Sequence, residues 1–303
     1  MANYLWGIDL GGTKIEAAIL DADKGYEPIL RTRIPTEASK GYEHIINQIA
    51  KLVDICSQEV GFKPEKIGIG TPGALDPQYQ TMKNSNTTSI NGMPLHKDLE
   101  AKLGIPVKLA NDANCFALAE TRMGIVADEY PDAEVVFGVI MGTGVGGGVV
   151  INGKIINGRH GIGGEWGHNF LDESGGECYC GLTGCVETVI SGAHLERYHR
   201  ETFGESIKLK EIVKRHKEGS DPNSTHTVNR LTHFFGKAIA SIINILDPDA
   251  IVLGGGVGNV DLLYTDGVEK AKEFAFNPYL NTAFLKPKLG DSAGVFGAAF
   301  LVE

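Results

Sequence analysis

The sequence lacks several features that whole classes of protein require. It contains no run of about 18 consecutive apolar residues, the length that a membrane-spanning helix needs. Its first residues include no basic segment and lead directly into a strand-like run, so we predict no secretory signal. Basic residues are the minority, 28 against 38 acidic ones, and the net charge of −10 repels a phosphate backbone. These absences predict a cytoplasmic protein with neither a membrane nor a nucleic acid as partner.

The common nucleotide-binding signatures are also missing. No G-x-x-x-x-G-K followed by Ser or Thr occurs, which excludes a P-loop enzyme, and neither H-R-D nor D-F-G occurs, which excludes protein-kinase chemistry. The G-x-G-x-x-G pattern of dinucleotide-binding proteins begins at Gly142 and again at Gly68. Neither copy leads into a helix in the expected structure, as that fingerprint requires, so a dinucleotide site is not predicted.

Glycine is abundant, with 40 residues, and clusters at 11–12, 142–148 and 254–258. Each cluster follows an apolar run of strand length, and helical periodicity lies between the runs, which together predict an α/β architecture. Two of the glycine turns join similar strand pairs, which suggests a duplicated unit and two halves facing each other across a cleft. The predicted strands are 4–10, 15–20, 66–70, 106–110, 135–141, 149–151 and 250–253, and the predicted helices are 41–60, 113–123 and 228–246.

The three glycine turns are candidate phosphate-binding loops. Bare backbone amides after a strand, with a nearby hydroxyl and a cation, offer several donors to phosphate oxygens. Asp9 heads the first turn and is the candidate ligand of Mg²⁺, and the third turn could admit an adenine ring. Each turn taken alone could equally be a plain structural hairpin. The candidate ATP-binding residues are Asp9, Gly11, Gly12, Thr13, Lys14, Gly142, Thr143, Gly144, Gly254, Gly255 and Gly256.

Asp112 is the candidate catalytic base. It follows a predicted strand that ends at Asn111, where catalytic groups are commonly held in α/β proteins. Phosphoryl transfer to a sugar hydroxyl needs a carboxylate that orients the hydroxyl and accepts its proton. Asn111 could bind a neighbouring hydroxyl. From the spacing alone, capping of the following helix by either residue explains the pair as well.

One histidine and three cysteines form a candidate zinc site. His168, Cys178, Cys180 and Cys185 supply one imidazole and three thiols, a complete tetrahedral set, and three of the chain's five cysteines fall within eight residues. Since protein would fill all four positions, the zinc is predicted to be structural. The alternative is packed free thiols beside an unrelated histidine.

Two glutamates flank the cysteine cluster. Glu165 lies three residues before His168, and Glu187 lies two residues after Cys185. Carboxylates accept hydrogen bonds from paired hydroxyls, and a metal would hold both on a rigid loop. We therefore expect Glu165 and Glu187 to bind a sugar.

These segments together resemble the ROK family of bacterial sugar kinases and repressors. The resemblance covers the whole chain and implies an actin-like, hexokinase-like (ribonuclease H-like) two-domain fold with an active-site cleft, and commonly a homodimer. It also implies Asp112 as base, zinc on the Cys₃His set, and sugar contacts from Asn111, His168 and the two glutamates. The segments that carry it are 9–14, 111–114, 142–148, 165–168 and 178–187.

Finer similarity favours the fructokinase and mannokinase branch. Its marks are segments 82–84, 91–94, 164–169, 178–180 and 244–249. N-acetylglucosamine kinases share segment 111–117 and the phosphate loops, so they are the competing interpretation. The tryptophan that family glucokinases typically carry near 86–91 is absent, and Asn86 is a candidate contact to the sugar's 2-position. The first phosphate loop begins at Asp9, which leaves no room for the helix-turn-helix domain of family repressors.

The expected function is transfer of the γ-phosphate of MgATP to the 6-hydroxyl of a hexose, fructose or mannose first. A small domain of residues 1–115 plus 290–303 would carry Asp112, and a large domain of 116–289 would carry the zinc site and the other two loops. Two interpretations from other classes stay open: a sugar-sensing regulator without turnover, and a non-sugar member of the actin-like superfamily.

Overall fold

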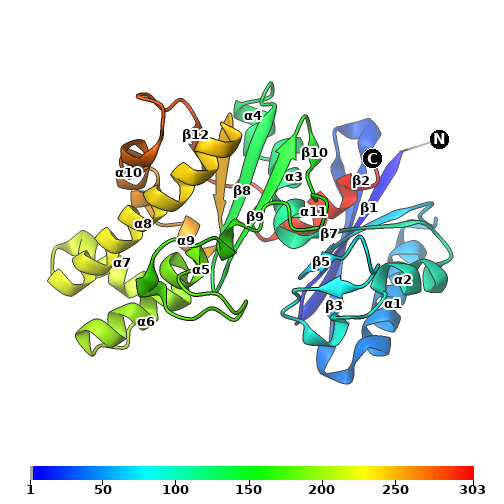
Figure 1. Cartoon of the computed structure of the whole chain (residues 1–303). Helices are drawn as coiled ribbons and strands as arrows, with labels where there is room; N and C mark the ends of the chain where they lie inside the picture. The colour runs from blue at the N-terminus through cyan, green and yellow to red at the C-terminus, as the bar shows by residue number, and fades with distance from the viewer. Residues whose placement is uncertain (1–2) are drawn as a thin grey trace. The chain divides into compact units, whose positions relative to one another are not determined.

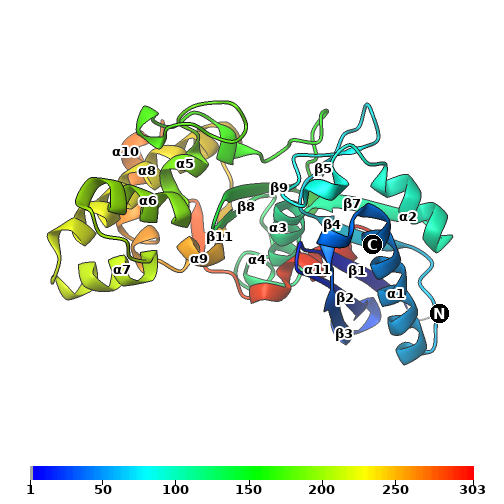
Figure 2. The same cartoon turned by 90° about the horizontal axis from the view of Figure 1, so that it is seen from below.

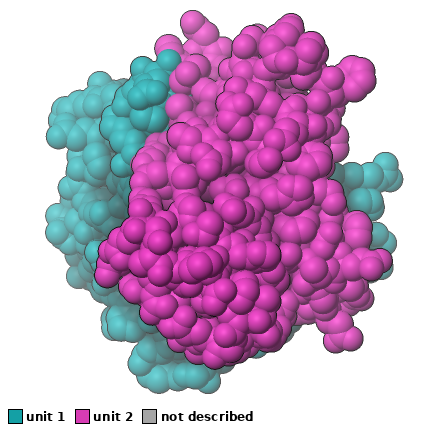
Figure 3. All heavy atoms as spheres, turned by 90° about the vertical axis from the view of Figure 1, so that its left-hand side faces the viewer, with its two compact units in different colours: residues 1–129, 148–163, 288–303 teal, residues 130–147, 164–287 magenta. Residues whose placement is uncertain are grey.

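A computed structural model describes residues 3–303, and the chain divides into two compact units (Figure 3). Unit 1 comprises residues 1–129, 148–163 and 288–303, and unit 2 comprises residues 130–147 and 164–287. Residues 1 and 2, which the predicted small domain includes, lie outside the described residues.

Unit 1 (coloured mainly blue to cyan in Figure 1) is built on a five-stranded sheet in the order β3-β2-β1-β4-β7, in which all five strands are labelled in Figure 2. The first three strands are antiparallel neighbours, whereas β4 and β7 run parallel to β1. The strands are β1 (Tyr4–Leu10), β2 (Lys14–Asp21), β3 (Glu27–Pro35), β4 (Ile67–Thr71), β7 (Val107–Asn111) and the small pair β5 (Ala74–Leu75) and β6 (Met82–Lys83). The helices are α1 (Tyr42–Val60), α2 (Leu95–Leu103), α3 (Asp112–Arg122), α4 (Ile125–Glu129) and α11 (Ala293–Phe300).

The two faces of this sheet are covered by different helices because side chains alternate along each strand. On one face, Trp6, Ile8 and Leu10 of β1 join a buried cluster with the apolar side of α1. On the other face, Gly7 lies under α11, and a Cβ there would come within 2.3 Å of a backbone oxygen of that helix. The missing side chain thus lets α11, the last helix of the chain, lie directly on the first strand (Figure 2).

Unit 2 contains most of a second five-stranded sheet, in the order β10-β9-β8-β11-β12, with β8, β11 and β12 parallel. The boundary between the units falls within β9, so β10 is counted with unit 1. The strands are β8 (Val135–Met141), β9 (Val145–Ile151), β10 (Lys154–Ile155), β11 (Ala250–Gly254) and β12 (Ala283–Leu285). The helices are α5 (Val186–Ile190), α6 (Gly192–Phe203), α7 (Leu209–Glu218), α8 (Pro222–Leu246), α9 (Gly255–Gly258) and α10 (Asp266–Phe274).

The α/β architecture predicted from the sequence is confirmed, with two local differences. The second strand of the β8–β9 hairpin begins at Val145, inside the predicted glycine loop, because the turn itself needs only residues 142–144. Helix α8 begins at Pro222 rather than 228, since Asp221 caps it and Pro222 suits its first position. Its end at Leu246, before Asp247-Pro248, agrees with the prediction.

The boundaries of the compact units differ from the predicted domains. Residues 116–129 and 148–163 belong to unit 1, together with a C-terminal segment that starts at Lys288. Helix α3 stays with unit 1 because it packs along α11, and Gly297 allows α11 to approach the backbone of Cys115. Among residues 3–303, no helix is long and apolar enough to span a membrane.

Candidate active site

The first glycine turn of unit 1 links β1 to β2. The Gly11 N–H donates to the Lys14 carbonyl at 3.0 Å, and the Thr36 hydroxyl donates to the Gly11 carbonyl at 2.6 Å, which fixes the turn. The Lys14 ammonium bonds the buried carboxylate of Glu16 at 3.2 Å. Burial alone would raise the pKa of Glu16, but hydrogen bonds from Arg31 and Lys14 outweigh it and lower that pKa. The Lys14 ammonium beside the turn is therefore held in position by the Glu16 carboxylate.

Asp9 lies at the end of β1, beside this turn. Burial raises the pKa of Asp9 to about 6, the negative charges of Asp112 and Glu16 add to the rise, and the charge of Lys14 opposes it. The carboxylate approaches α11 closely, since a Cβ on Gly294 would lie 3.2 Å from Asp9 Oδ2. A buried carboxylate with a raised pKa beside other negative charges is the kind of site that a divalent cation stabilises, so the surroundings of Asp9 fit Mg²⁺.

Asn111 and Asp112 stand where β7 ends and α3 begins. Asn111 is the N-cap of α3, and its Oδ1 accepts a hydrogen bond from the Ala113 N–H at 2.8 Å. The capping interpretation is therefore confirmed for Asn111. Asp112 is the first helical residue, is exposed, and also accepts from the Ala113 N–H at 2.8 Å. Its position at the helix N-terminus stabilises the charged carboxylate.

Asn86 lies in an exposed bend between β6 and a 3₁₀ turn at Thr88–Ile90. Asn91 closes this loop, because its side chain exchanges hydrogen bonds of 2.9 Å with both the N–H and the carbonyl of Ser85. Thr87 lies against the first glycine turn, since a Cβ on Gly12 would come within 3.3 Å of its hydroxyl. The structure thus brings the Asn86 loop to the first glycine turn within unit 1.

The second glycine turn, in unit 2, joins β8 to β9. The Gly142 N–H donates to the Gly144 carbonyl at 2.9 Å, and the Gly142 carbonyl accepts from the Gly192 N–H at 2.8 Å. Glu187 Oε2 accepts from the Val145 N–H at 2.9 Å, and a Cβ on Gly144 would come within 2.5 Å of that oxygen. The residue predicted to bind sugar is therefore hydrogen-bonded to the predicted phosphate loop.

The third glycine cluster forms the short helix α9 rather than an open loop. Gly255 has a φ of 79° and lies so close to Met141 that a Cβ would come within 2.3 Å of its carbonyl oxygen. Only glycine can adopt this φ and also lie this close to the Met141 carbonyl. The second and third clusters are consequently neighbours at the ends of β8 and β11.

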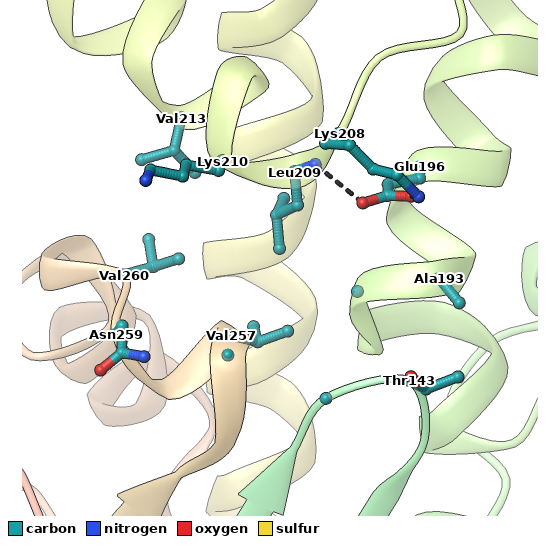
Figure 4. A pocket seen from close by; sticks show the side chains of 13 residues that line it. Thr143, Ala193, Glu196, Lys208, Leu209, Lys210, Val213, Val257, Asn259 and Val260 are labelled. Carbon is teal, nitrogen blue, oxygen red and sulfur yellow. Dashed lines mark hydrogen bonds and ion pairs between the residues drawn. The ribbon is translucent and has the colours of Figure 1, made fainter.

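Both clusters open onto a pocket of about 830 Å³ that lies wholly in unit 2 (Figure 4). Helix α7 supplies Leu209 and Val213 on one side, and Val257 and Val260 supply apolar surface near α9. Glu196 accepts a hydrogen bond from the Leu209 N–H at 3.0 Å, which fixes the start of α7. Apolar walls that end at a glycine turn suit a planar base attached to a phosphate chain.

Sequence reasoning missed the part of the pocket that α6 and α7 contribute. The available signal was the apolar spacing of Leu209, Ile212 and Val213, which marks one face of a helix. That spacing shows a buried face but does not show what lies opposite it. The missed lining residues are Gly192, Ala193, Glu196, Lys208, Leu209, Lys210, Val213, Val257, Asn259 and Val260.

The predicted metal ligands converge in unit 2. The donor atoms of His168, Cys178, Cys180 and Cys185 all lie within 4.8 Å of one another. His168 Nδ1 faces the Cys178 sulfur at 3.6 Å, and the Cys180 and Cys185 sulfurs are 3.6 Å apart. None of the chain's five cysteines, all within the described residues, forms a disulfide. One imidazole and three thiols in this arrangement fit a tetrahedral zinc ion.

Glu165 precedes the 3₁₀ turn Trp166–His168, which leads into the metal cluster. The indole N–H of Trp166 donates to the Gly146 carbonyl at 3.1 Å, which ties this turn to β9. Burial raises the pKa of Glu165, the neighbouring Glu187 raises it further, and His168 opposes the rise. Glu165, His168 and Glu187 are thus near one another, although His168 Nε2 is engaged by the Tyr179 hydroxyl at 3.0 Å.

A family comparison gives this arrangement its context. The model of the ROK family matches residues 5–303. The chain belongs to the ROK family. Among its ROK-family relatives, N-acetyl-D-glucosamine kinase of Aliivibrio fischeri (strain ATCC 700601 / ES114) is 36% identical over 306 residues, covering 98% of each chain.

Solved structures of the ROK family show the same fold. A ROK hexokinase from Thermus thermophilus superposes with a TM-score of 0.86 at 32% identity, covering 98% of this chain and 97% of that one. A ROK family glucokinase from Streptomyces griseus, solved in complex with glucose and AMPPNP, gives a TM-score of 0.77 at 29% identity over 99% of both chains. The hexokinase-like fold expected from the resemblance is therefore confirmed.

Proposed function

We propose that this ROK-family chain is an ATP-dependent sugar kinase. The observation that carries the proposal is the pocket of unit 2, whose apolar walls end at the Gly142–Thr143 turn and at Gly256. The base of ATP would lie between Leu209 and Val257, and the glycine amides would bind its phosphates. The named kinases among the relatives support the same activity.

Unit 1 would supply the groups that act on the acceptor hydroxyl. Asp112 orients that hydroxyl and accepts its proton, a role that suits an exposed carboxylate at a helix N-terminus. Asp9 would hold Mg²⁺, directly or through water, and Lys14 would bind phosphate oxygens. The bound Mg²⁺ neutralises charge on the phosphates. The prediction that the two halves face each other across a cleft stays a prediction.

Glu165 and Glu187 would bind the sugar in unit 2, with Asn111 and Asn86 as contacts from unit 1. Burial raises the pKa of Glu165, so its carboxyl keeps a proton to higher pH than a free glutamate does, and the protonated form can donate as well as accept a hydrogen bond. Zinc on His168 and the three cysteines would hold the loop from which both glutamates project. The homodimer expected from the resemblance remains part of this proposal.

N-acetyl-D-glucosamine is the first substrate to test, and the 6-hydroxyl is the proposed acceptor. Relatives 36–37% identical over nearly the whole chain carry the name N-acetyl-D-glucosamine kinase, which favours this sugar over the fructose or mannose predicted from short motifs. Selectivity between these sugars rests on few contacts around the 2-position and can differ by orders of magnitude.

A coupled ADP-release assay with MgATP tests the proposal. The sugars are N-acetyl-D-glucosamine, N-acetylmannosamine, glucose, fructose and mannose, and phosphorus NMR of the product locates the phosphate. We expect the highest kcat/KM with N-acetyl-D-glucosamine and a 6-phosphate product. A lead for fructose or mannose would retain the kinase and reverse the substrate assignment. Sugar binding by calorimetry with no ADP release from any sugar would overturn the kinase and favour a sensor.

A further inference from the structure

A second group of metal-ligating side chains lies apart from the cysteine cluster, at the junction of α6, α7 and α8. It consists of His199 on α6, Glu205 in the following loop, and Asp221, the N-cap of α8. One ligand atom of each residue lies within 4.8 Å of the other two. All three residues belong to unit 2, and none of them lines the proposed nucleotide pocket.

The hydrogen bonds of His199 define which ring nitrogen carries the proton. The Thr227 hydroxyl donates its one proton to the Asn223 carbonyl at 3.1 Å. The same hydroxyl lies 2.8 Å from His199 Nδ1, and in the tautomer that keeps the Asn223 bond it accepts from Nδ1. In that neutral tautomer Nδ1 carries the proton and Nε2 is a bare lone pair.

That lone pair is buried and points toward carboxylates. The His199 side chain is 0% exposed, and Nε2 has no hydrogen-bond partner within residues 3–303. The Glu205 Oε2 atom lies 3.9 Å away, too far for a hydrogen bond. A buried ring nitrogen without a hydrogen-bond partner is unfavourable, and a cation bound between it and the Glu205 carboxylate would satisfy both groups.

The surrounding charges favour a divalent cation. Arg215 pairs with Glu205 at 2.8 Å and with Glu211 at 3.1 Å, and Lys214 lies 4.0 Å from Glu211. These two positive charges balance the two glutamates, and Asp221 adds a further negative charge. The Asp221 carboxylate accepts from the Asn223 N–H at 3.0 Å and from the Ser224 N–H at 3.1 Å, which holds it at the start of α8. Arg215 donates to both Glu205 oxygens, at 2.8 Å to Oε1 and 3.0 Å to Oε2, so a metal at Oε2 would use its remaining lone pair while Arg215 keeps Oε1.

We propose that His199 Nε2, Glu205 and Asp221 form a second zinc site, which joins the end of α6 to the start of α8. An imidazole with two carboxylates suits zinc better than the all-oxygen shells of Mg²⁺ or Ca²⁺. Ligand atoms around a tetrahedral zinc are about 3.3 Å apart for bonds of about 2.0–2.2 Å, so small side-chain movements close the site. A water molecule would complete the coordination. The metal would brace α7, whose Leu209 and Val213 line the pocket.

Zinc stoichiometry of the full chain tests this site. Apoprotein is saturated with zinc, exchanged into metal-free buffer, and its bound zinc is counted by elemental and native mass spectrometry. The test variants are Asp221→Asn, which preserves the helix cap, and Glu205→Gln. Glu211→Gln is the matched control, because it also pairs with Arg215 but lies outside the group. Thermal unfolding is recorded with and without zinc.

We expect Asp221→Asn and Glu205→Gln each to bind one zinc fewer than the wild type and to lose part of the zinc-dependent rise in Tm, whereas Glu211→Gln matches the wild type. The result is the difference in bound zinc between each variant and the wild type. This difference does not depend on whether the cysteine cluster is occupied. Equal zinc content in the wild type and both test variants would overturn the site. So would the loss of one zinc in the Glu211→Gln control.

Discussion

The carboxylate of Glu187 accepts a hydrogen bond from the Val145 N–H at 2.9 Å and lies directly against Gly144. A residue two positions after a cysteine of the metal cluster thereby sets the position of the glycine turn at the nucleotide pocket. If Glu187 also binds the sugar, the two substrates share a contact through one side chain.

Replacement of Glu187 is therefore expected to affect both substrates. A hydrogen bond to a charged group contributes about 1.5–3 kcal/mol, so Glu187→Ala should lower kcat/KM for ATP and for sugar by about 10- to 100-fold. Glu165→Gln should lower kcat/KM for the sugar and leave kcat/KM for ATP unchanged, because Glu165 has no hydrogen bond to the Gly142–Gly144 turn among the described residues. Steady-state kinetics with each substrate varied separates the two. An unchanged ATP parameter in Glu187→Ala would contradict the coupling.

Asp112→Asn should reduce turnover by at least about 10²-fold, the scale of general-base loss. The fold should be retained, since Asn111 supplies the cap of α3. Asp128→Asn provides the control, because this exposed carboxylate of unit 1 pairs with Lys288 and has no proposed role in catalysis. Circular dichroism checks the fold of both variants. A folded Asp112→Asn enzyme with near-normal turnover would show that another group serves as base.

Asp9→Asn should stabilise the metal-free protein while abolishing activity. Because the pKa of Asp9 rises from 3.8 to about 6 on folding, ionisation of Asp9 lowers the stability of the folded state. This loss of stability is absent below pH 3.8, grows between pH 3.8 and 6, and is complete above pH 6. Without Mg²⁺, the free energy of unfolding of the variant should exceed that of the wild type by up to about 3 kcal/mol at pH 7.5 and should equal it at pH 3.5. Urea unfolding at the two pH values measures this. An equal effect at both would exclude the ionisation of Asp9 as its cause.

The cysteine cluster should bind zinc with an affinity that falls as the pH falls. Burial and the neighbouring thiols Cys180 and Cys178 raise the pKa of Cys185 to about 12, so zinc must displace its proton. Cys180→Ser should remove this zinc and lower the Tm. Cys56→Ser, which replaces a buried thiol of α1, should leave the zinc content unchanged. Competition with a chromophoric chelator at several pH values gives the affinity, and pH-independent affinity would contradict proton displacement.

Local patterns in the sequence were enough to predict the buried strands and the grouping of the four Cys₃His side chains. Strands β1 and β8 match the predicted ranges, because their apolar runs end at glycine turns that no strand continues through. The four metal-ligating residues could be assigned together because three of them fall within eight positions. The role of Asn111 as cap was visible as an alternative, since capping depends on neighbouring residues alone.

Other features depended on contacts between distant segments, which leave little trace in a local pattern. The return of α11 onto β1 and the contribution of α7 to the pocket join parts of the chain that are far apart in sequence. The sequence by itself determined the α/β architecture, the glycine turns and the Cys₃His set, because hydrophobic periodicity, backbone freedom and donor chemistry act over a few residues. Only the tertiary structure decided that Glu187 accepts a hydrogen bond at the second glycine turn and that His199, Glu205 and Asp221 lie together. Such pairs arise where separate helices and strands pack together, and their geometry is set by that packing.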